Sequence, residues 1–219
     1  MIITPKGSFI QRDKETYAIV PKTPLGLIAP ELMKTIADVA IKYNIPIIKI
    51  TSGQRMALVG MKPEIIDDVW NDLGTDVGPA VELCVHYVQA CPGTAVCKFG
   101  TQDSLGLGMI LDKMLVNIDL ELPAKAKIGI SGCPNTCGES RVRDIGVIGK
   151  KSGWTFVFGG NSGARPRIGD VIAEKLTTDE VVELAQKCLN YYKANANKKE
   201  RTARFIERIG IEEFKKAVL

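Results

Sequence analysis

The sequence predicts an α+β protein, and three observations support this fold class. The 219 residues are 45% hydrophobic and 25% charged, which are the proportions of a folded globular protein. Short apolar runs rich in β-branched residues predict strands, whereas longer stretches with apolar residues three and four positions apart predict helices. In the first third of the chain these elements follow the order β-α-β-β-α, which favours a small, mainly antiparallel sheet.

The elements of the N-terminal part are separated by turn residues, and a proline lies at the start of both predicted helices. The expected strands are Tyr17–Val20, Ile45–Ile50 and Met56–Val59, and the expected helices are Pro30–Tyr43 and Pro63–Leu73. This part ends at a turn over Gly74–Gly78. We therefore expect a first domain over residues 1–77 and a second over residues 78–219.

The C-terminal part contains buried strands and several helices. The expected strands are Leu83–Gln89, Ala126–Ile130, Ile145–Ile148 and Thr155–Phe158. The expected helices are Ser104–Val116, Thr178–Lys193, Lys199–Ile209 and Ile211–Val218. Asp103 is suited to cap the first of these helices, and the acidic pair Asp179 and Glu180 suits the first turn of the second.

The charge balance and hydropathy exclude some function classes. Lys and Arg total 29 against 25 Asp and Glu, a net charge of +4, which is too small an excess to indicate a nucleic-acid partner. No stretch approaches the roughly 18 apolar residues of a membrane span. The first residues lack the basic and apolar regions of a signal peptide. We therefore expect a cytoplasmic protein, in which thiols stay reduced.

Four of the six cysteines form two close pairs. Five residues separate Cys91 from Cys97, three separate Cys133 from Cys137, and thirty-five lie between the pairs. Four thiolates in this arrangement suit a cubane 4Fe-4S cluster, which takes one sulfur per iron. Pro134 suits the first position of a helical turn, which would bring the second pair onto one face, where free N–H groups stabilise a negative cluster.

Other interpretations of the cysteines stay open. A structural zinc site usually has pairs separated by two to four residues, so the five-residue gap counts against zinc. Disulfides or inert core thiols are the remaining alternatives, although reduced thiols are expected in the cytoplasm. Cys84 and Cys188 lie in apolar segments and are expected to be small buried side chains.

The segment before Cys133 alternates strictly in character. On a strand, one face would carry apolar side chains and the other would carry Lys125, Lys127, Gly129 and Ser131. Small residues in a strand often mark the close approach of another group. This face is either a solvated edge of the sheet or a site in which the lysines hold an anionic substrate above a flat cofactor lying over Gly129 and Ser131.

Three further features have both a functional and a purely structural interpretation. The turn Thr51–Arg55 presents Arg55 either to a cleft or simply to solvent. His86, the only histidine, lies in an apolar strand, where a histidine is usually a core residue with satisfied hydrogen bonds. Gly159–Gly163 is either a plain turn or an anion-binding nest, and it lacks the context of a nucleotide-binding motif.

These motifs resemble the siroheme and 4Fe-4S signature of the sulfite and nitrite reductases. The likeness rests on the Cys-x5-Cys pair, on Gly132-Cys133-Pro134-Asn135-Thr136-Cys137, and on the flanking blocks Lys98–Asp103, Asp144–Val147 and Gly159–Asn161. Residues Gly7–Leu73, with Gln11 and Thr51–Arg55, are similar to the ferredoxin-like half-domain of that family. The single module looks most like the low-molecular-weight assimilatory-type sulfite reductases. The resemblance implies a ferredoxin-like half-domain followed by an α/β domain that binds siroheme and the 4Fe-4S cluster.

The resemblance also implies roles for individual residues. The cluster ligands would be Cys91, Cys97, Cys133 and Cys137, with Cys137 shared between the cluster and the siroheme iron. The substrate-binding positions would be Arg55, Lys125 and Lys127, and His86 stands where the family has a second arginine. The expected cofactor contacts are Gly129, Ser131, Asn135, Gly159, Gly160 and Asn161. The candidates for siroheme carboxylates are Arg141, Arg143, Arg165 and Arg167.

The function implied by this resemblance is the reduction of sulfite to sulfide with electrons passing through the cluster. The alternatives are nitrite reduction to ammonia by the same site, a cluster-only electron-transfer module, and a siroheme-bearing sensor or chaperone without turnover. No flavin or nicotinamide motif is visible, so an external donor such as ferredoxin is expected. The basic segment Lys193–Arg204 is either its docking patch or a solvated helix face. Larger members contain the module twice, which suggests a homodimer here.

Overall fold

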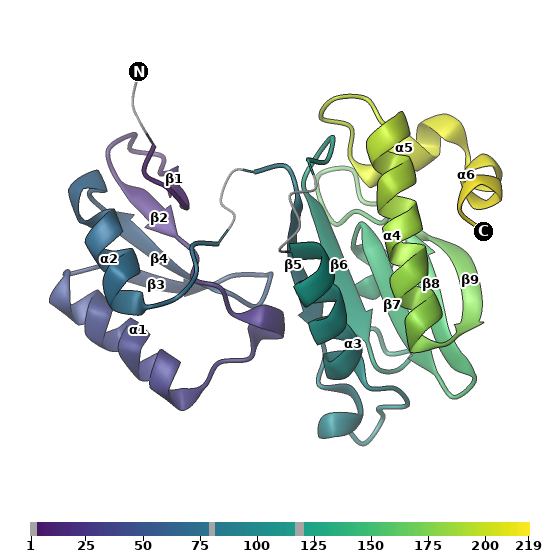
Figure 1. The fold of residues 1–219 in the computed structure, drawn as a ribbon, viewed down its shortest axis with the longest axis horizontal. Helices are drawn as coiled ribbons and strands as arrows, with labels where there is room; N and C mark the ends of the chain where they lie inside the picture. The colour runs from purple at the N-terminus through teal and green to yellow at the C-terminus, as the bar shows by residue number, and fades with distance from the viewer. Residues whose placement is uncertain (1–3, 79–81, 117–120) are drawn as a thin grey trace. The chain divides into compact units, whose positions relative to one another are not determined.

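The structure is a computed structural model that describes residues 4–78, 82–116 and 121–219. The chain divides into two compact units, Met1–Glu82 and Leu83–Leu219, each with a sheet of its own (Figure 1). Both units combine strands with helices, which confirms the predicted α+β class. Within the described ranges, no helix is long and apolar enough to cross a membrane.

The first unit is built on an antiparallel sheet with the strand order β1-β2-β4-β3. Its elements are β1 (Ser8–Ile10), β2 (Tyr17–Ile19), α1 (Pro30–Lys42), β3 (Ile47–Ile50), β4 (Met56–Met61) and α2 (Ile66–Leu73), with a 3-10 turn over Pro63–Ile65 before α2. Ile36 of α1, Leu58 of β4 and Val69 of α2 are buried in one apolar cluster, which joins the helices to the sheet. The sequence pattern did not predict β1, because three residues are too few to show a period.

Strand β3 forms one edge of this sheet, and all four of its residues are exposed. Ile47, Ile48 and Ile50 leave 52%, 43% and 70% of their surface accessible. An apolar edge strand is unusual in a monomeric protein because its free backbone groups and side chains favour association.

The second unit is built on a mixed sheet with the strand order β5-β6-β7-β8-β9. The strands are β5 (Val85–Ala90), β6 (Ala126–Ser131), β7 (Ile145–Lys150), β8 (Gly153–Phe158) and β9 (Asp170–Leu176). The first three are parallel, and β8 and β9 continue the sheet in antiparallel fashion. The alternation predicted for β6 is confirmed on its apolar face, since Ala126, Ile128 and Ile130 are all buried. The strand β9 was not predicted.

The helices of the second unit are α3 (Ser104–Leu111), α4 (Thr178–Asn195), α5 (Thr202–Ile209) and α6 (Ile211–Val218). Asp103 caps α3 as predicted, because its carboxylate accepts from the amide of Gly106 at 2.9 Å. After Leu111 the chain continues as a π-helical turn rather than as the predicted α-helix. Helix α4 begins one residue after Thr177, which forms a capping box with Glu180.

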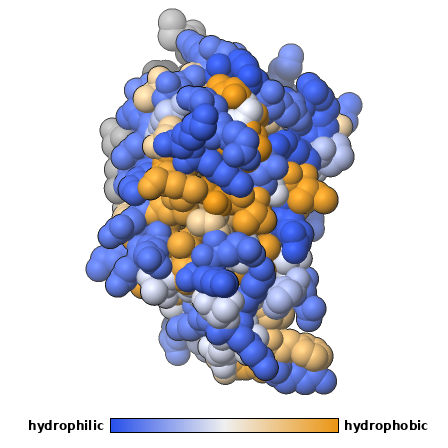
Figure 2. All heavy atoms as spheres, turned by 90° about the vertical axis from the view of Figure 1, so that its right-hand side faces the viewer, coloured by the Kyte–Doolittle hydropathy of each residue, from blue (hydrophilic) through white to orange (hydrophobic). Residues whose placement is uncertain are grey.

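Aromatic rings hold the C-terminal helices to the sheet. Phe158 of β8 stacks on Phe214 of α6 with ring centroids 4.5 Å apart, and Tyr192 of α4 meets Phe205 of α5 edge to face at 5.4 Å. Figure 2 shows this side of the molecule with hydrophobic atoms gathered in the middle and hydrophilic side chains around them. Ile168 and Leu219 are among the large apolar residues exposed in the second unit.

Candidate functional site

The two cysteine pairs are brought to one edge of the second sheet by parallel strands. β5 and β6 run in the same direction with Ala90 opposite Ile130, and the amide of Cys91 donates to the carbonyl of Ile130 at 3.0 Å. Cys91 follows the end of β5, and Cys133 follows the end of β6 by two residues. Because the carboxyl ends of parallel strands lie at the same edge of a sheet, the first cysteines of the two pairs, Cys91 and Cys133, lie at one edge.

The chain over residues 91–102, which contains the first cysteine pair, packs tightly against Gly132, the residue before Cys133. The carbonyl of Gly132 accepts hydrogen bonds from the amides of Thr101 and Gln102 at 2.8 and 3.0 Å. A Cβ added to Gly132 would lie only 2.7 Å from Cα of Gly93. The glycine is therefore required by the close approach of two backbones.

The sulfur of Cys91 has polar neighbours. The amide of Gly132 donates to Sγ of Cys91 at 3.1 Å, and the hydroxyl of Ser104 lies 3.6 Å from the same sulfur while donating to the carbonyl of Cys91. Hydrogen bonds of this kind stabilise a thiolate and tune the potential of an iron–sulfur cluster.

The second cysteine pair lies on a turn, so the predicted helical turn at Pro134 is wrong. Thr136 and Glu139 have positive φ angles of 54° and 56°, which an α-helix does not allow. Cys133 is buried and Cys137 is exposed. Cys137 is therefore accessible to a group outside the protein chain.

The six cysteines are all free thiols, so the disulfide alternative finds no support. No group of three or more His, Cys, Asp or Glu side chains in the described ranges converges as ligands of a single metal ion would. A cubane requires less convergence, because each of its four thiolates binds a different iron atom.

The polar face of β6 is covered by the chain that follows Cys137. A Cβ added to Gly129 would lie 2.5 Å from the carbonyl oxygen of Gly138, and Ser131 is fully buried with its hydroxyl 2.7 Å from that of Ser140. This corrects the expected placement of a flat cofactor directly over Gly129 and Ser131, because the segment after Cys137 already fills that space.

A cationic cluster lies at the other end of this face. The ring of Tyr87 has Nζ of Lys127 at 5.7 Å and the guanidinium carbon of Arg143 at 5.8 Å from its centroid. Arg143 is buried and pairs with Glu139. Lys125 and Lys127 are half-buried. An anion approaching Lys127 would meet its ammonium group beside Arg143, whose own charge is paired with Glu139.

His86 lies in an irregularity of β5 and not in the regular ladder. Val85 pairs with Ala126 and Tyr87 with Lys127, so His86 is an extra residue between two register positions. His86 is also buried. The side chain that faces Lys127 is consequently that of Tyr87, which the sequence alone did not single out.

The carboxylate of Asp144 organises the start of β6 and β7. It is buried and accepts from the amide of Lys127 at 2.9 Å, from the guanidinium of Arg201 at 2.7 Å and from the hydroxyl of Thr202 at 2.6 Å. The backbone carbonyl of Asp144 accepts a hydrogen bond from the amide of Gly159 at 2.9 Å. Asp144 thus links Lys127 to the glycine loop and to the beginning of α5.

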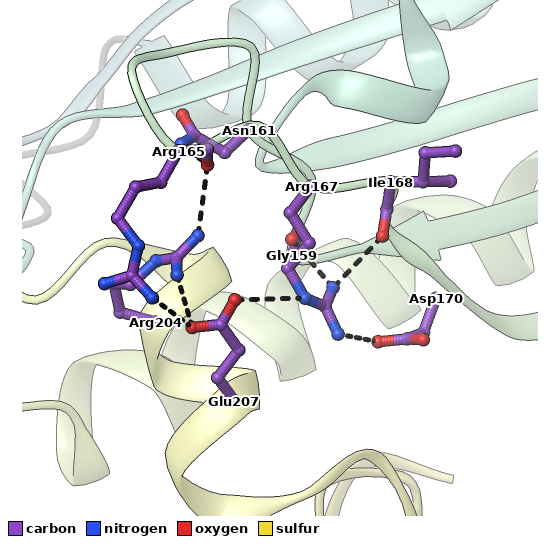
Figure 3. A network of polar contacts seen from close by, with 8 residues as sticks. All are labelled: Gly159, Asn161, Arg165, Arg167, Ile168, Asp170, Arg204 and Glu207. Atoms are coloured by element: carbon purple, nitrogen blue, oxygen red, sulfur yellow. Dashed lines mark hydrogen bonds and ion pairs between the residues drawn. The ribbon is translucent and has the colours of Figure 1, made fainter.

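The loop that begins at Gly159 is held by arginines rather than left open (Figure 3). Arg167 donates to the carbonyl of Gly159 at 2.9 Å and to the carboxylate of Asp170 at 2.5 Å. Glu207 of α5 pairs with Arg204. Its carboxylate also lies 3.7 Å from the guanidinium of Arg165 and 3.9 Å from that of Arg167.

Asn161, one of the expected cofactor contacts, joins the two ends of this loop. Its amide group donates to the carbonyl of Arg165 at 2.8 Å. Gly160 packs on the backbone of Arg143, where an added Cβ would lie 2.4 Å from the carbonyl oxygen. Among the four candidate arginines, Arg141 and Arg165 are exposed, Arg165 beside Glu207, whereas Arg143 and Arg167 are less exposed and pair with Glu139 and Asp170. Asn135 is exposed beside Cys137.

Arg55 lies in the first unit at the start of β4. The amide of Thr51 donates to the carbonyl of Arg55 at 2.8 Å, and Gln54 adopts a φ of 59° in the turn between them. The side chain of Arg55 is half-buried, so it is not simply the exposed tip of a hairpin.

The chain matches two protein-family models. Residues 83–219 match the nitrite and sulphite reductase 4Fe-4S domain, and residues 9–75 match the nitrite/sulfite reductase ferredoxin-like half domain. The chain is 58% identical over 215 residues to the assimilatory-type sulfite reductase of Nitratidesulfovibrio vulgaris, with 98% of each chain covered. It is 42% identical over 202 residues to the NAD(P)H nitrite reductase of Bacillus subtilis, of which it covers 25%.

Two solved structures show the same fold. A crystal structure of dissimilatory sulfite reductase I superposes with a TM-score of 0.82 at 14% identity and covers 93% of this chain and 69% of its own. The NirA protein of Mycobacterium tuberculosis superposes with a TM-score of 0.76 at 20% identity, covering 97% of this chain and 41% of its own.

These matches confirm the family expected from the motifs. Its members are oxidoreductases that use a 4Fe-4S cluster and siroheme, and both cysteine pairs of this chain lie in the matched 4Fe-4S domain. The chain belongs to the siroheme and 4Fe-4S family of nitrite and sulfite reductases.

Proposed function

We propose that this protein reduces sulfite to sulfide, with the oxygens leaving as water and the electrons coming from a separate donor. The observation that carries the proposal is the 58% identity to an assimilatory-type sulfite reductase, which extends over 98% of both chains. Nitrite reduction by the same site is the second candidate, because a nitrite reductase is 42% identical over 202 residues. We propose the division into a half-domain over residues 1–77 and a cofactor domain over residues 78–219.

The thiolates of Cys91, Cys97, Cys133 and Cys137 are proposed as the cluster ligands. The packing of Gly132 against the first loop and the hydrogen bond to Cys91 Sγ support this role, since both are expected around a cluster that must be held rigidly. Cys137 is proposed as the ligand shared with the siroheme iron, because its thiol is exposed. Siroheme would supply the open iron position at which sulfite is reduced.

The residues near Cys137 suit an anionic macrocycle and an anionic substrate. The segment after Cys137 folds back to Gly129, which lies two residues from Lys127, or about 7 Å along the strand. Nε of Arg143 is buried and has no hydrogen-bond acceptor among the described residues. A carboxylate of siroheme is the kind of acceptor that this Nε lacks, while the other end of the guanidinium pairs with Glu139.

Lys125, Lys127 and Arg55 are proposed to bind the oxyanion, and His86 is kept as a proposed contributor. The positive charges of the two lysines and the arginine would neutralise the oxyanion and favour the loss of oxygen after protonation. The remaining proposed cofactor contacts are Asn135, Gly159, Gly160 and Asn161, which lie on the two loops described above. Gly129 and Ser131 act on the macrocycle only indirectly, since the chain covers them.

The electron donor is proposed to be an acidic protein such as a ferredoxin. Within Lys193–Arg204 the arginines are engaged, because Arg201 pairs with Asp144 and Arg204 with Glu207. Lys193, Lys198 and Lys199 are exposed and are proposed to receive the donor. Such an enzyme is proposed to work in the cytoplasm, where its thiols stay reduced.

A homodimer is also proposed, paired through β3. This edge strand exposes three isoleucines, and identical edges can pair across a two-fold axis. Sedimentation velocity tests it: the wild type should sediment as a dimer and Ile48→Lys as a monomer. A monomeric wild type at micromolar concentration would show that the proposed dimer is wrong, and the proposed sulfite reduction would not depend on that result.

The proposed activity is tested with protein purified without oxygen from cells that make siroheme. The absorption spectrum should show an isobacteriochlorin band together with iron–sulfur absorbance, and steady-state rates with reduced methyl viologen should give a higher kcat/KM for sulfite than for nitrite. A higher value for nitrite would favour the second candidate. A cluster spectrum without siroheme would indicate an electron-transfer module, and siroheme without turnover of either anion would indicate a sensor or chaperone.

A further inference from the structure

We propose that Ser131 is a positioning residue that fixes Cys137. The sequence placed Ser131 on a face open to a cofactor, but the structure buries it completely at the end of β6. Its hydroxyl instead accepts from the amide of Gly138, the residue that follows Cys137, at 3.0 Å. The proposal rests on the proposed function, because Cys137 is a cofactor ligand only there.

The hydroxyl of Ser131 belongs to a relay whose direction is determined. It lies 2.7 Å from the hydroxyl of Ser140, which lies 3.0 Å from the carbonyl oxygen of Val147. A carbonyl can only accept, so Ser140 gives its single hydrogen to Val147 and offers only lone pairs to Ser131. The relay therefore runs from the amide of Gly138 through Ser131 and Ser140 to β7. Buried hydrogen bonds in series strengthen one another.

A second hydrogen bond holds the carbonyl group of the same residue, Gly138. The side-chain amide of Gln89 donates to the carbonyl oxygen of Gly138 at 3.0 Å, and Gln89 is buried in β5. A Cβ on Gly138 would lie 2.0 Å from the carbonyl oxygen of Ile130. Gly138 therefore packs against β6 and is hydrogen-bonded to side chains of β5 and β6. Through the relay it is also connected to β7, so all three parallel strands fix its position.

The turn around Cys137 needs this support. Thr136 and Glu139 flank the Cys137–Gly138 pair, and both adopt left-handed φ angles without being glycine. Such conformations persist only where the surroundings enforce them. Cys137 itself is exposed, so its direction is set by the tethered glycine rather than by packing of its own side chain.

The test is Ser131→Ala in the loaded enzyme. Iron and siroheme contents should equal those of the wild type, while the visible absorption maximum of the siroheme shifts, its reduction potential changes and kcat for sulfite falls several-fold with KM unchanged. These readouts report on the iron ligand, and a loss of stability alone would not move them. A spectrum and a potential identical to those of the wild type would overturn the proposal.

Two further variants complete the experiment. Ser8→Ala is the matched control, since Ser8 is also a buried serine whose hydroxyl donates to a backbone carbonyl, that of Pro5 at 2.6 Å, but it lies in the first unit. Its siroheme spectrum should not change. If Ser131→Ala fails to fold, Ser140→Ala shortens the relay and should give a smaller shift in the same direction, and no shift would count against the relay.

The siroheme content of the wild type separates a wrong function from a wrong role of Ser131. If the wild type carries no siroheme, the proposed function is wrong. If the wild type carries siroheme and both serine variants of the relay match it in spectrum and potential, the proposed function stands and only the role of Ser131 is wrong.

Discussion

The amide of Gly132 donates a hydrogen bond to Sγ of Cys91 across 3.1 Å, and this contact joins residues 41 positions apart in the sequence. It connects the end of β6, just before the second cysteine pair, to the first cysteine of the other pair. An N–H that points at a ligand sulfur favours the more negative state of a cluster. The contact exists only because position 132 has no side chain and two backbones come together there.

Gly132→Ala should therefore cost the protein its cluster. The added Cβ would lie 2.7 Å from Cα of Gly93 and 2.8 Å from the carbonyl oxygen of Gln102, so the first loop must move. We expect the loss of most of the iron and a destabilisation of about 1–3 kcal/mol. Iron analysis and urea unfolding measure both. Gly74→Ala, where a Cβ meets nothing within 4 Å, should keep its iron despite a φ of 61°. Full iron content in Gly132→Ala would contradict the cluster site.

Cys97→Ala should also remove the cluster, because one iron would lose its thiolate. The matched control is Cys188→Ala in α4. Burial raises the pKa of the Cys188 thiol, which keeps it protonated and unsuited to bind iron. The control should cost about 1 kcal/mol of stability through the cavity it leaves, with its iron–sulfur absorbance unchanged. Loss of iron from Cys188→Ala but not from Cys97→Ala would show that the ligands are wrongly assigned.

Lys127→Ala should reduce kcat/KM for sulfite by roughly 100-fold, since a preorganised positive charge beside a reacting oxyanion contributes on that order. The absorption spectrum should stay that of the wild type, and Lys127→Arg should recover part of the activity. Lys151→Ala, at an exposed lysine of the turn between β7 and β8, should leave the rate unchanged. An unaltered rate in Lys127→Ala would exclude the lysine from the anion site.

The strongly periodic and strongly apolar elements of the fold could be predicted from the sequence, whereas the edge strands β1 and β9 could not. Helix α6 has the predicted bounds, Ile211–Val218, because its apolar and charged residues alternate with helical period and a glycine precedes it. The strand β9 buries only Ile172, and its apolar run, Val171–Ala173, has only three residues and is flanked by charged ones. It is held in the sheet by pairing with β8, a long-range interaction that local patterns do not reveal.

The site shows the same division. The cysteine spacing predicted that the two pairs meet at one cluster, whereas the parallel pairing of β5 and β6, which places Cys91 and Cys133 at one edge, was not predicted. The position of Tyr87 was not predictable, because the irregularity at His86 shifts the alternation of β5 by one residue. The folding back of Gly138 was missed as well, since it depends on left-handed turns at two residues, Thr136 and Glu139, that rarely adopt them.

The carboxylate of Asp13 should stabilise the first unit only above acidic pH. Hydrogen bonds from the side chain of Thr16, and from the amides of Thr16 and Glu15, lower the pKa of Asp13 to about 2. Because the folded value lies below the unfolded one of about 4, this stabilisation is complete above pH of about 4 and is lost as the pH falls towards 2. Asp13→Ala should lower the urea midpoint, followed by tryptophan fluorescence, at pH 7 and much less at pH 2.

Asp76→Ala is the control for this titration, since Asp76 is an exposed carboxylate of the same unit. Its effect on the midpoint at pH 7 should be smaller than that of Asp13→Ala. An equal deficit of Asp13→Ala at both pH values would mean that the turn is stabilised without the charge.

Glu207 should govern the rigidity of the loop over residues 159–169. It accepts from Arg204, which in turn donates to the carbonyl of Arg165 at 3.1 Å, and it lies 3.9 Å from Arg167 (Figure 3). In Glu207→Gln the three guanidinium groups lose the one negative charge they share, so they repel one another. The amides of Asn161 and Arg167, which bond to each other's carbonyls at 2.9 and 2.8 Å, should then exchange with solvent several-fold faster.

Hydrogen exchange followed by mass spectrometry measures this loosening, with Glu212→Gln in α6 as the control that changes the same net charge elsewhere. Because partly exposed ion pairs contribute only about 0–1 kcal/mol each, the global unfolding midpoint should move little in either variant. A drop in the global midpoint without faster exchange of the loop would show that Glu207 supports α5 instead. Faster exchange confined to the loop, together with weaker siroheme retention, would connect these arginines to the cofactor through the backbone they hold rather than through direct contact.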